Sequence, residues 1–182
     1  MAAAAPVDVS PESAPLEQPY PPLDRDGLAG QARWIGVSVL HGGVRLSRPS
    51  RWIIRDAAVE PGRSYIAYVS PTGAYAFGIY ERSDAPTDVW RDIEQRYEND
   101  VATAGAKLLG QRIPVATDTN QGRAYTVSRK VESGKASLNS RSREVLLRSE
   151  HRVVLVQMVT QDDAMGRLET ELLEVLRHIE VL

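Results

Sequence analysis

Cysteine is absent from this sequence of 182 residues. Its absence excludes disulfide bonds, catalytic thiolates and thiolate metal sites. Long apolar runs are also lacking, since no stretch approaches the roughly 20 residues of a membrane-spanning helix. No basic segment is followed by an apolar one, as in a signal peptide. The net charge is −2, so the overall balance favours neither nucleic acid nor an anionic membrane as a partner.

Motifs for catalysis and metal binding are missing too. The three histidines, His41, His151 and His178, show no i,i+4 spacing and no His-Glu-x-x-His motif. There is no Gly-x-Ser-x-Gly or Gly-x-Gly-x-x-Gly pattern. Gly134-Lys135 is followed by alanine where a phosphate-binding loop has Ser or Thr. We therefore expect no catalytic residue, no cofactor and no metal ion, and we favour binding over enzymatic activity.

The first 26 residues differ in composition from the rest. They hold six of the eleven prolines and an alanine run, and such a segment cannot offset the entropy of ordering it. We expect residues 1–26 to be a disordered leader or tether and residues 27–182 to form one domain. The leader is similar to Ala/Pro-rich tethers that follow processed signals in exported bacterial proteins, and an ordinary disordered terminus is an equal alternative. Abundant alanine, with far more arginine than lysine, is typical of a GC-rich bacterial genome.

Residue spacing divides the domain into strands and two helices. Residues 64–69 and 74–80 alternate and are joined by Ser70-Pro71-Thr72-Gly73, a typical hairpin turn. Helical spacing then predicts a long amphipathic helix over 87–106, capped by Thr87 or Asp84, and a C-terminal helix with an apolar stripe from Leu168 to Ile179. Further strands are expected at 33–40, 44–46, 108–117, 122–131, 144–149 and 152–160, core positions at Trp52, Ile53 and Ile54, and a polar mobile loop at Glu132 to Arg143.

This order predicts the fold class. A run of strands precedes the long helix, and four strands and a helix follow it. Runs of strands with few helices favour an antiparallel sheet. We expect an α+β fold in which the long central helix and the C-terminal helix pack on that sheet, as an α/β/α-like sandwich.

Three segments carry a family resemblance. Residues 43–49 (GVRLSRP) with Trp52 match an opening of the form G-apolar-x-apolar-x-x-P-x-x-W, residues 67–71 match a strand-to-turn segment, and residues 172–179 match a closing helix. Together they resemble the PsbP-like superfamily, which includes PsbP, the Mog proteins and DcrB-type lipoproteins. The strand at residues 33–40 has no clear match. The resemblance implies a mostly non-catalytic module that docks on other proteins.

The resemblance also bears on lipidation. DcrB-type lipoproteins carry a lipobox cysteine, and this sequence has none. Either that segment lies upstream of Met1 or the protein is not lipidated. A membrane is therefore expected as a partner only through a tether outside this sequence.

A run of basic residues follows the long helix. Residues 123–152 include eight Lys and Arg residues but only three glutamates. If the strands pair, some of these cations line one sheet face and form a docking patch for another protein with an acidic surface. Charged protection of edge strands against aggregation is an equal alternative. The candidate partner-binding residues are Arg123, Arg129, Lys130, Lys135, Arg141 and Arg143.

Three functions follow from these observations. We favour a non-enzymatic protein-binding module of the bacterial periplasm or cell envelope. The second hypothesis is a cytoplasmic adaptor chaperone for a secreted effector, which requires an apolar concavity on the sheet that exposes more than the few hundred Å² typical of monomers. The third is a hydrolase-type enzyme with a carboxylate site, which requires a deep pocket holding two or more acids with perturbed pKa values.

Overall fold

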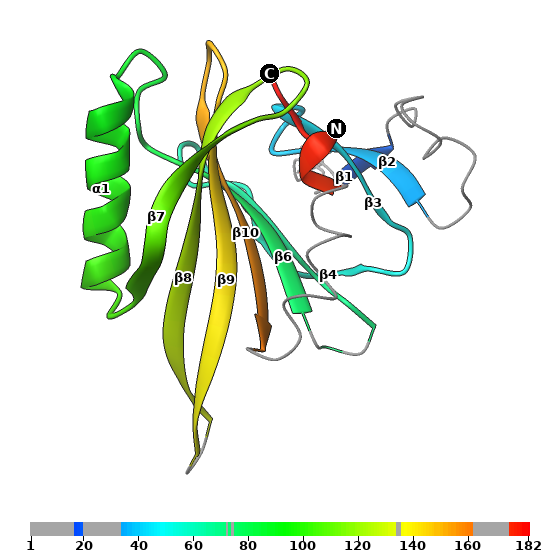
Figure 1. Ribbon diagram of the computed structural model, residues 1–182. Coiled ribbons are helices and arrows are strands. Elements are labelled where there is room, and N and C mark those ends of the chain that lie inside the picture. The colour runs from blue at the N-terminus through cyan, green and yellow to red at the C-terminus, as the bar shows by residue number, and fades with distance from the viewer. Residues whose placement is uncertain (1–16, 20–33, 72, 74, 134–135, 162–174) are drawn as a thin grey trace, which may run out of the picture.

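The computed structural model describes residues 17–19, 34–71, 73, 75–133, 136–161 and 175–182 (Figure 1). In this part of the chain, eleven strands accompany one main helix, α1 (Trp90–Thr103). The strands are β1 (Glu17–Pro19), β2 (Trp34–Val39), β3 (Val44–Pro49), β4 (Ile53–Ala58), β5 (Tyr65–Val69), β6 (Tyr75–Glu81), β7 (Lys107–Ala116), β8 (Gln121–Ser133), β9 (Ala136–Arg148), β10 (Val153–Gln161) and β11 (Glu180–Val181).

The larger sheet has seven antiparallel strands in the order β4-β5-β6-β10-β9-β8-β7. It contains the predicted hairpin, now β5 and β6, in which Ile66 lies opposite Ile79 and Tyr68 opposite Phe77. All four side chains are at most 1% exposed. Because side chains alternate between faces along a strand, these four share one face, as their spacing predicted.

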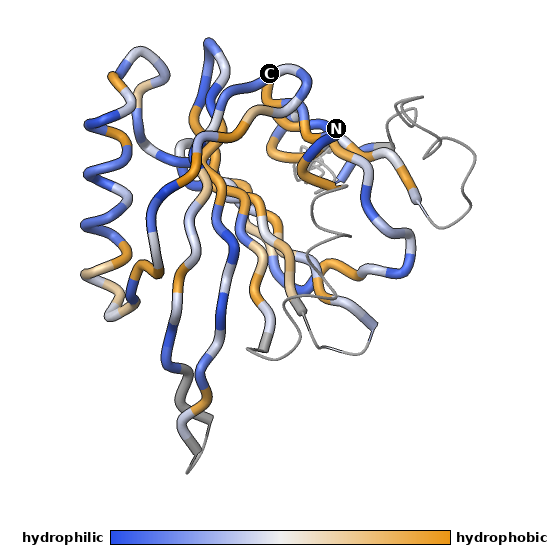
Figure 2. Tube along the Cα trace, viewed as in Figure 1, coloured by the Kyte–Doolittle hydropathy of each residue, from blue (hydrophilic) through white to orange (hydrophobic). Residues whose placement is uncertain are grey.

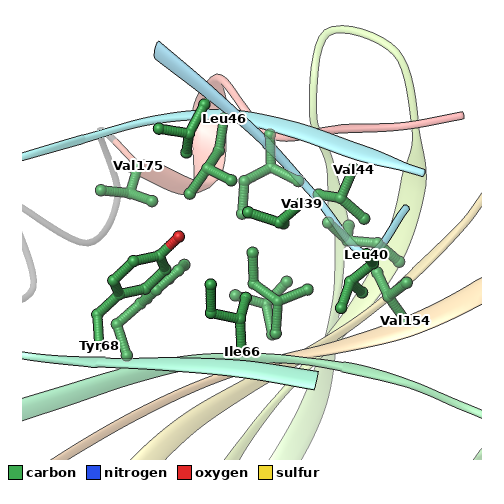
Figure 3. Close-up of a cluster of buried hydrophobic side chains, with 14 of the residues drawn as sticks. Val39, Leu40, Val44, Leu46, Ile66, Tyr68, Val154 and Val175 are labelled. Carbon is green, nitrogen blue, oxygen red and sulfur yellow. The ribbon is translucent and has the colours of Figure 1, made fainter. Parts of the chain in front are cut away.

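A second sheet, in the order β1-β2-β3-β11, packs on that face. Figure 3 shows Ile66 and Tyr68 pointing toward Val39 and Leu46 of the smaller sheet. The α+β class and the antiparallel pairing are confirmed, but the prediction of a single sheet is wrong. The last strand of the smaller sheet is β11, in which Val181 pairs with Val44 of β3. These segments are far apart in the sequence, so local periodicity does not predict their pairing.

The helix α1 covers the opposite face of the larger sheet. Ile93, Tyr97 and Val101 are buried there against β8 and β9, which confirms the predicted apolar stripe. Below, the helix face is the side of the seven-stranded sheet that carries α1, and the core face is the side against which the four-stranded sheet packs. Figure 1 shows α1 and the smaller sheet on opposite sides of the strands β7–β10.

The predicted caps of α1 are wrong. The helix begins after Val89, which makes no side-chain capping hydrogen bond. Asp84 instead forms ion pairs with Arg82 and Arg96, with its side chain almost fully buried. A capping side chain accepts a hydrogen bond from a backbone N–H group. The carboxylate of Asp84 accepts instead from two charged guanidinium groups, and such charge-assisted hydrogen bonds are stronger.

Two further expectations differ from the structure. Trp52 is buried as predicted, but Ile53 is 61% exposed and Ile54 is 38% exposed, because both lie on the outermost strand β4. The predicted polar loop at Glu132 to Arg143 is instead strand, formed by the end of β8 and most of β9. A strand ladder is held by backbone hydrogen bonds, so polar side chains do not prevent it.

The C-terminal helix was expected to carry its stripe from Leu168 onward. Residues 162–174 lie outside the described part of the chain, so most of that prediction does too. Residues 175–177 are helical, and Val175 and Ile179 are buried in the core between the sheets.

The leader prediction also needs a correction. Glu17–Pro19 fall inside the segment expected to be disordered, yet they form β1 and pair with β2. Residues 1–16 and 20–26 lie outside the described part of the chain. Among the described helices, none has the length and apolar character needed to cross a membrane.

Candidate binding surface

The β8–β9 hairpin is the largest element of the sheet, with 13 residues in each strand. Its neighbours are shorter. β7 pairs with β8 only as far as Ser128, and β10 pairs with β9 only as far as Ser140. Within the described residues, 129–133 and 136–139 therefore have no third strand beside them. Figure 1 shows this end of the hairpin extending beyond the rest of the sheet, and Figure 2 shows that it is mostly hydrophilic.

The register of this hairpin places the predicted basic residues on two different faces. Tyr125 lies opposite Glu144 and faces α1, so the alternate positions Arg123 and Arg129 also lie on the helix face. Lys130, opposite Asn139, lies on the core face, as do Arg141 and Arg143. Lys135 lies outside the described residues. The structure thus does not bring the six residues into one patch.

Arg123 joins the helix to the sheet. Its guanidinium lies over the ring of Trp90 at 4.5 Å from the centroid, and its Nε is 3.0 Å from Oε1 of Glu94. Arg148 lies over the same ring at 4.6 Å. A guanidinium over an aromatic face is attracted by the ring quadrupole. Arg123 is therefore part of the helix–sheet contact.

Arg129 holds a buried carboxylate. It donates to Ser142 Oγ at 2.6 Å and to the fully buried Glu144. Glu144 also accepts hydrogen bonds from Tyr97 Oη at 2.7 Å, from Ser142 Oγ at 2.6 Å and from Gln157 Nε2 at 2.9 Å. Burial raises the pKa of the Glu144 carboxyl, but its hydrogen bonds and the Arg129 charge outweigh burial and hold the pKa below its ordinary value.

Sequence reasoning missed this buried cluster. It assigned Tyr97 to the apolar stripe of α1 and counted Glu144 only as an opposing charge. A signal is nevertheless present, because Ser142, Glu144 and Leu146 alternate on one face of β9. A glutamate in such a row requires a buried cation or several donors. Arg129 is the cation that meets this requirement.

The core face of the hairpin carries the other three cations. Lys130 is exposed, while Arg141 and Arg143 are half-buried. Arg143 donates to Thr126 Oγ1, directly across the ladder, at 2.6 Å. Cations at alternate positions are roughly 7 Å apart along a strand. Lys130, Arg141 and Arg143 therefore form one basic strip, the core-face strip, which begins on the projecting end of the hairpin.

An apolar pocket of about 330 Å³ adjoins this strip. Arg143 lines it together with aliphatic side chains of β7, β8 and β9 and residues near the C-terminus. Ile113, at its edge, is 52% exposed. The described lining residues are Ile113, Val115, Ala116, Thr117, Ala124, Arg143, Val145, Leu147, Leu176 and Arg177.

The histidines do not gather at this surface or at any metal site. His41 and His151 are exposed, and His178 is buried near the C-terminus. Across the described ranges, no group of three or more His, Asp or Glu side chains is arranged to hold a metal ion. The predictions of no metal, no cofactor and no catalytic residue stay predictions.

Comparison with known proteins identifies the fold. No protein-family model matches the chain, and no curated protein matches its sequence. The solution structure of cyanobacterial PsbP (CyanoP) from Synechocystis sp. PCC 6803 is similar, with a TM-score of 0.58 at 16% identity over 88% of this chain and 99% of that chain. A crystal structure from Bacteroides thetaiotaomicron VPI-5482 has a TM-score of 0.53 at 14% identity, over 78% of this chain and 46% of that chain.

A more distant similarity is to LpqN, involved in cell envelope biogenesis of Mycobacterium tuberculosis. It has a TM-score of 0.42 at 10% identity, over 76% of this chain and 82% of that chain.

An antiparallel sheet with a helix on one face and a smaller sheet on the other defines an α+β domain. The similarity to cyanobacterial PsbP shows that this domain has the PsbP-like fold. The resemblance drawn from residues 43–52, 67–71 and 172–179 is thereby confirmed as a resemblance in fold.

Proposed function

We propose that the chain is a non-enzymatic protein-binding module of the bacterial cell envelope, and that it docks through the core-face strip. The observation that carries this proposal is the hairpin that projects beyond its neighbours with cations gathered on one face. A surface of one sign steers a partner of the opposite sign and fixes its orientation. The partner is therefore a protein with an acidic surface.

The division of the basic residues between two faces narrows the docking surface. Arg123 and Arg129 are engaged with Trp90, Glu94 and Glu144 inside the protein. Changing them would alter stability together with binding. The docking role therefore falls on Lys130, Arg141 and Arg143, of which Lys130 is the most accessible.

The place in the cell envelope is supported by the Ala/Pro-rich composition of residues 1–26, which suits a tether in an exported protein. The alternative is a cytoplasmic location. Release of the native protein with the periplasmic fraction of its host would support export, and recovery with a cytoplasmic marker enzyme would contradict it.

Site-specific photocrosslinking in host cells tests the docking surface. A benzophenone amino acid at Asn139, opposite Lys130 on the projecting end, is expected to give a discrete protein adduct. The matched control places the same group at the exposed Gln95 of α1. We expect Lys130→Glu to reduce the Asn139 adduct roughly tenfold, because it reverses one charge of the strip.

Equal adducts from Asn139 and Gln95 would contradict the docking surface, as would an Asn139 adduct that Lys130→Glu leaves unchanged. Mass spectrometry identifies the peptide of the partner that is crosslinked. If that peptide is basic, the electrostatic argument is contradicted.

A second candidate function is favoured by the apolar pocket. The pocket of about 330 Å³ beside the half-exposed Ile113 is an apolar concavity that could hold a side chain of a client, although it is smaller than the concavity that an adaptor chaperone is expected to need.

The pocket predicts binding of the dye ANS, which pairs aromatic rings with an anionic sulfonate. We expect the folded protein to raise ANS fluorescence, because the rings suit the aliphatic lining and the sulfonate suits Arg143. Ala124→Phe, which fills the pocket, should abolish the increase. Ala102→Phe, at an exposed position on α1, is the matched control. An increase equal in both variants would show that the dye binds elsewhere.

A further inference from the structure

The clearest built site outside the hairpin is a carboxylate socket at the edge of the four-stranded sheet. Its occupant is Glu17 of β1. Arg48 Nε lies 3.0 Å from Glu17 Oε2, Arg48 Nη2 lies 2.7 Å from Oε1, and Tyr68 Oη donates to Oε2 at 2.6 Å. The Arg48 side chain is only 8% exposed. Bidentate contacts of this kind are the strong and directional form of the arginine–carboxylate pair.

Arg48 also has contacts that do not involve Glu17. Arg48 Nη1 donates to the carbonyl oxygens of Pro49 at 3.0 Å and Trp52 at 3.1 Å. Its guanidinium lies 4.8 Å from the centroid of the Tyr68 ring. Burial, followed by the hydrogen bond to Glu17, raises the pKa of the Tyr68 phenol, so it remains a donor at neutral pH. The orientation of the Arg48 guanidinium therefore does not depend on Glu17 alone.

Strand β2 is longer than the strand β1 that pairs with it. β1 has three residues and pairs with Val37–Val39, which is half of the six-residue strand β2. Among the described residues, no strand lies beside the outer edge of residues 34–36, and Ile35 is 36% exposed. An unpaired strand edge offers N–H and C=O groups to an added strand.

We propose that the outer edge of β2 and the Arg48–Tyr68 socket form a strand-addition site for an extended, glutamate-containing segment of a partner protein. Residues 17–19 occupy this site in cis and show which chemistry fits it: an extended backbone with one acidic side chain directed at Arg48. A partner strand that spans all of β2 gains main-chain hydrogen bonds that the three-residue β1 does not make. The tethered segment competes through its high effective concentration.

The test uses the full chain and a fluorescent peptide with the sequence of residues 12–22, ESAPLEQPYPP. Glu17→Ala removes the competing carboxylate, so we expect this variant to bind the peptide at least roughly tenfold more tightly than the parent chain. Arg48→Met added to Glu17→Ala should abolish binding. A peptide with glutamine in place of the glutamate that corresponds to Glu17 should bind at least roughly tenfold more weakly.

Peptide binding should also raise the Tm of the Glu17→Ala variant, since the ligand refills the socket. If Glu17→Ala lacks native circular dichroism, Glu17→Gln keeps the shape of the side chain and takes its place. Equal affinity for the glutamate and glutamine peptides would overturn the socket. If the parent chain and the Glu17→Ala variant bind the peptide with equal affinity, Glu17 does not compete with the peptide for the socket. A Glu17→Ala variant that dimerises in sedimentation would instead assign the edge to a second copy of the chain.

Discussion

Replacement of Arg129 by methionine is expected to lower the free energy of unfolding by about 3 kcal/mol, within the range measured when one partner of a buried ion pair is removed. Methionine keeps much of the apolar stem but leaves Glu144 without its counter-charge. Tyr97, Ser142 and Gln157 still donate to the carboxylate, which places the cost at the lower end of that range. Urea unfolding at pH 7 measures the change.

The neighbouring residue provides the matched control. Lys130 follows Arg129 on β8 but is exposed on the core face. Lys130→Met is expected to change stability by about 0.5 kcal/mol or less. Glu144→Gln added to Arg129→Met should recover part of the loss, because it removes the buried charge. A loss in Arg129→Met no larger than that in Lys130→Met would show that Glu144 does not depend on Arg129.

The pH dependence gives the same experiment an internal check. The pKa of Glu144 in the folded protein lies below its ordinary value, so the folded state binds this proton less readily than the unfolded chain. The stability that Glu144 contributes is complete above the unfolded pKa of about 4.3 and is lost as pH falls through the folded pKa. Without Arg129, burial acts with less opposition and the pKa rises. The difference in the free energy of unfolding between the parent chain and Arg129→Met should therefore become smaller as pH is lowered.

Strand and helix positions could be predicted because each has a local signal. Ile66 and Tyr68 alternate, Phe77 and Ile79 alternate, and the stripe on α1 repeats with helical spacing; the structure buries all of these residues. The division into two sheets has no such signal. Alternation identifies the buried face of a strand but not the sheet that covers it.

The candidate site shows the same limit. Arg129 and Lys130 are adjacent on one strand, so the sequence alone places them on opposite faces. What it does not provide is the register with β9, which sets Glu144 beside Arg129 and aligns Arg141 and Arg143 with Lys130. Composition identifies a basic segment, but only the strand pairing separates the cation of the buried pair, Arg129, from the cations of the core-face strip.

Trp52→Ala and Ile53→Ala distinguish the structure from the sequence prediction, which assigned both residues to the core. Trp52 is 3% exposed and packs on Phe77 with ring centroids 5.4 Å apart, whereas Ile53 is 61% exposed. Loss of a buried aromatic ring costs about 3–5 kcal/mol, from lost burial and from the cavity that remains. An exposed aliphatic side chain contributes about 0.5 kcal/mol or less. Urea unfolding of the two variants should therefore differ by several kcal/mol.

The contact with Phe77 can be isolated by a double-mutant cycle. Trp52→Ala leaves the Trp52 carbonyl oxygen that accepts from Arg48 in place, so the cycle reports on the rings. We expect Trp52 and Phe77 to be coupled by about 0.5–1.5 kcal/mol, as aromatic pairs are, and Ile53 and Phe77 to be additive. If Ile53→Ala destabilises the protein as much as Trp52→Ala does, Ile53 is buried too and the outer strand β4 of the larger sheet is wrongly placed.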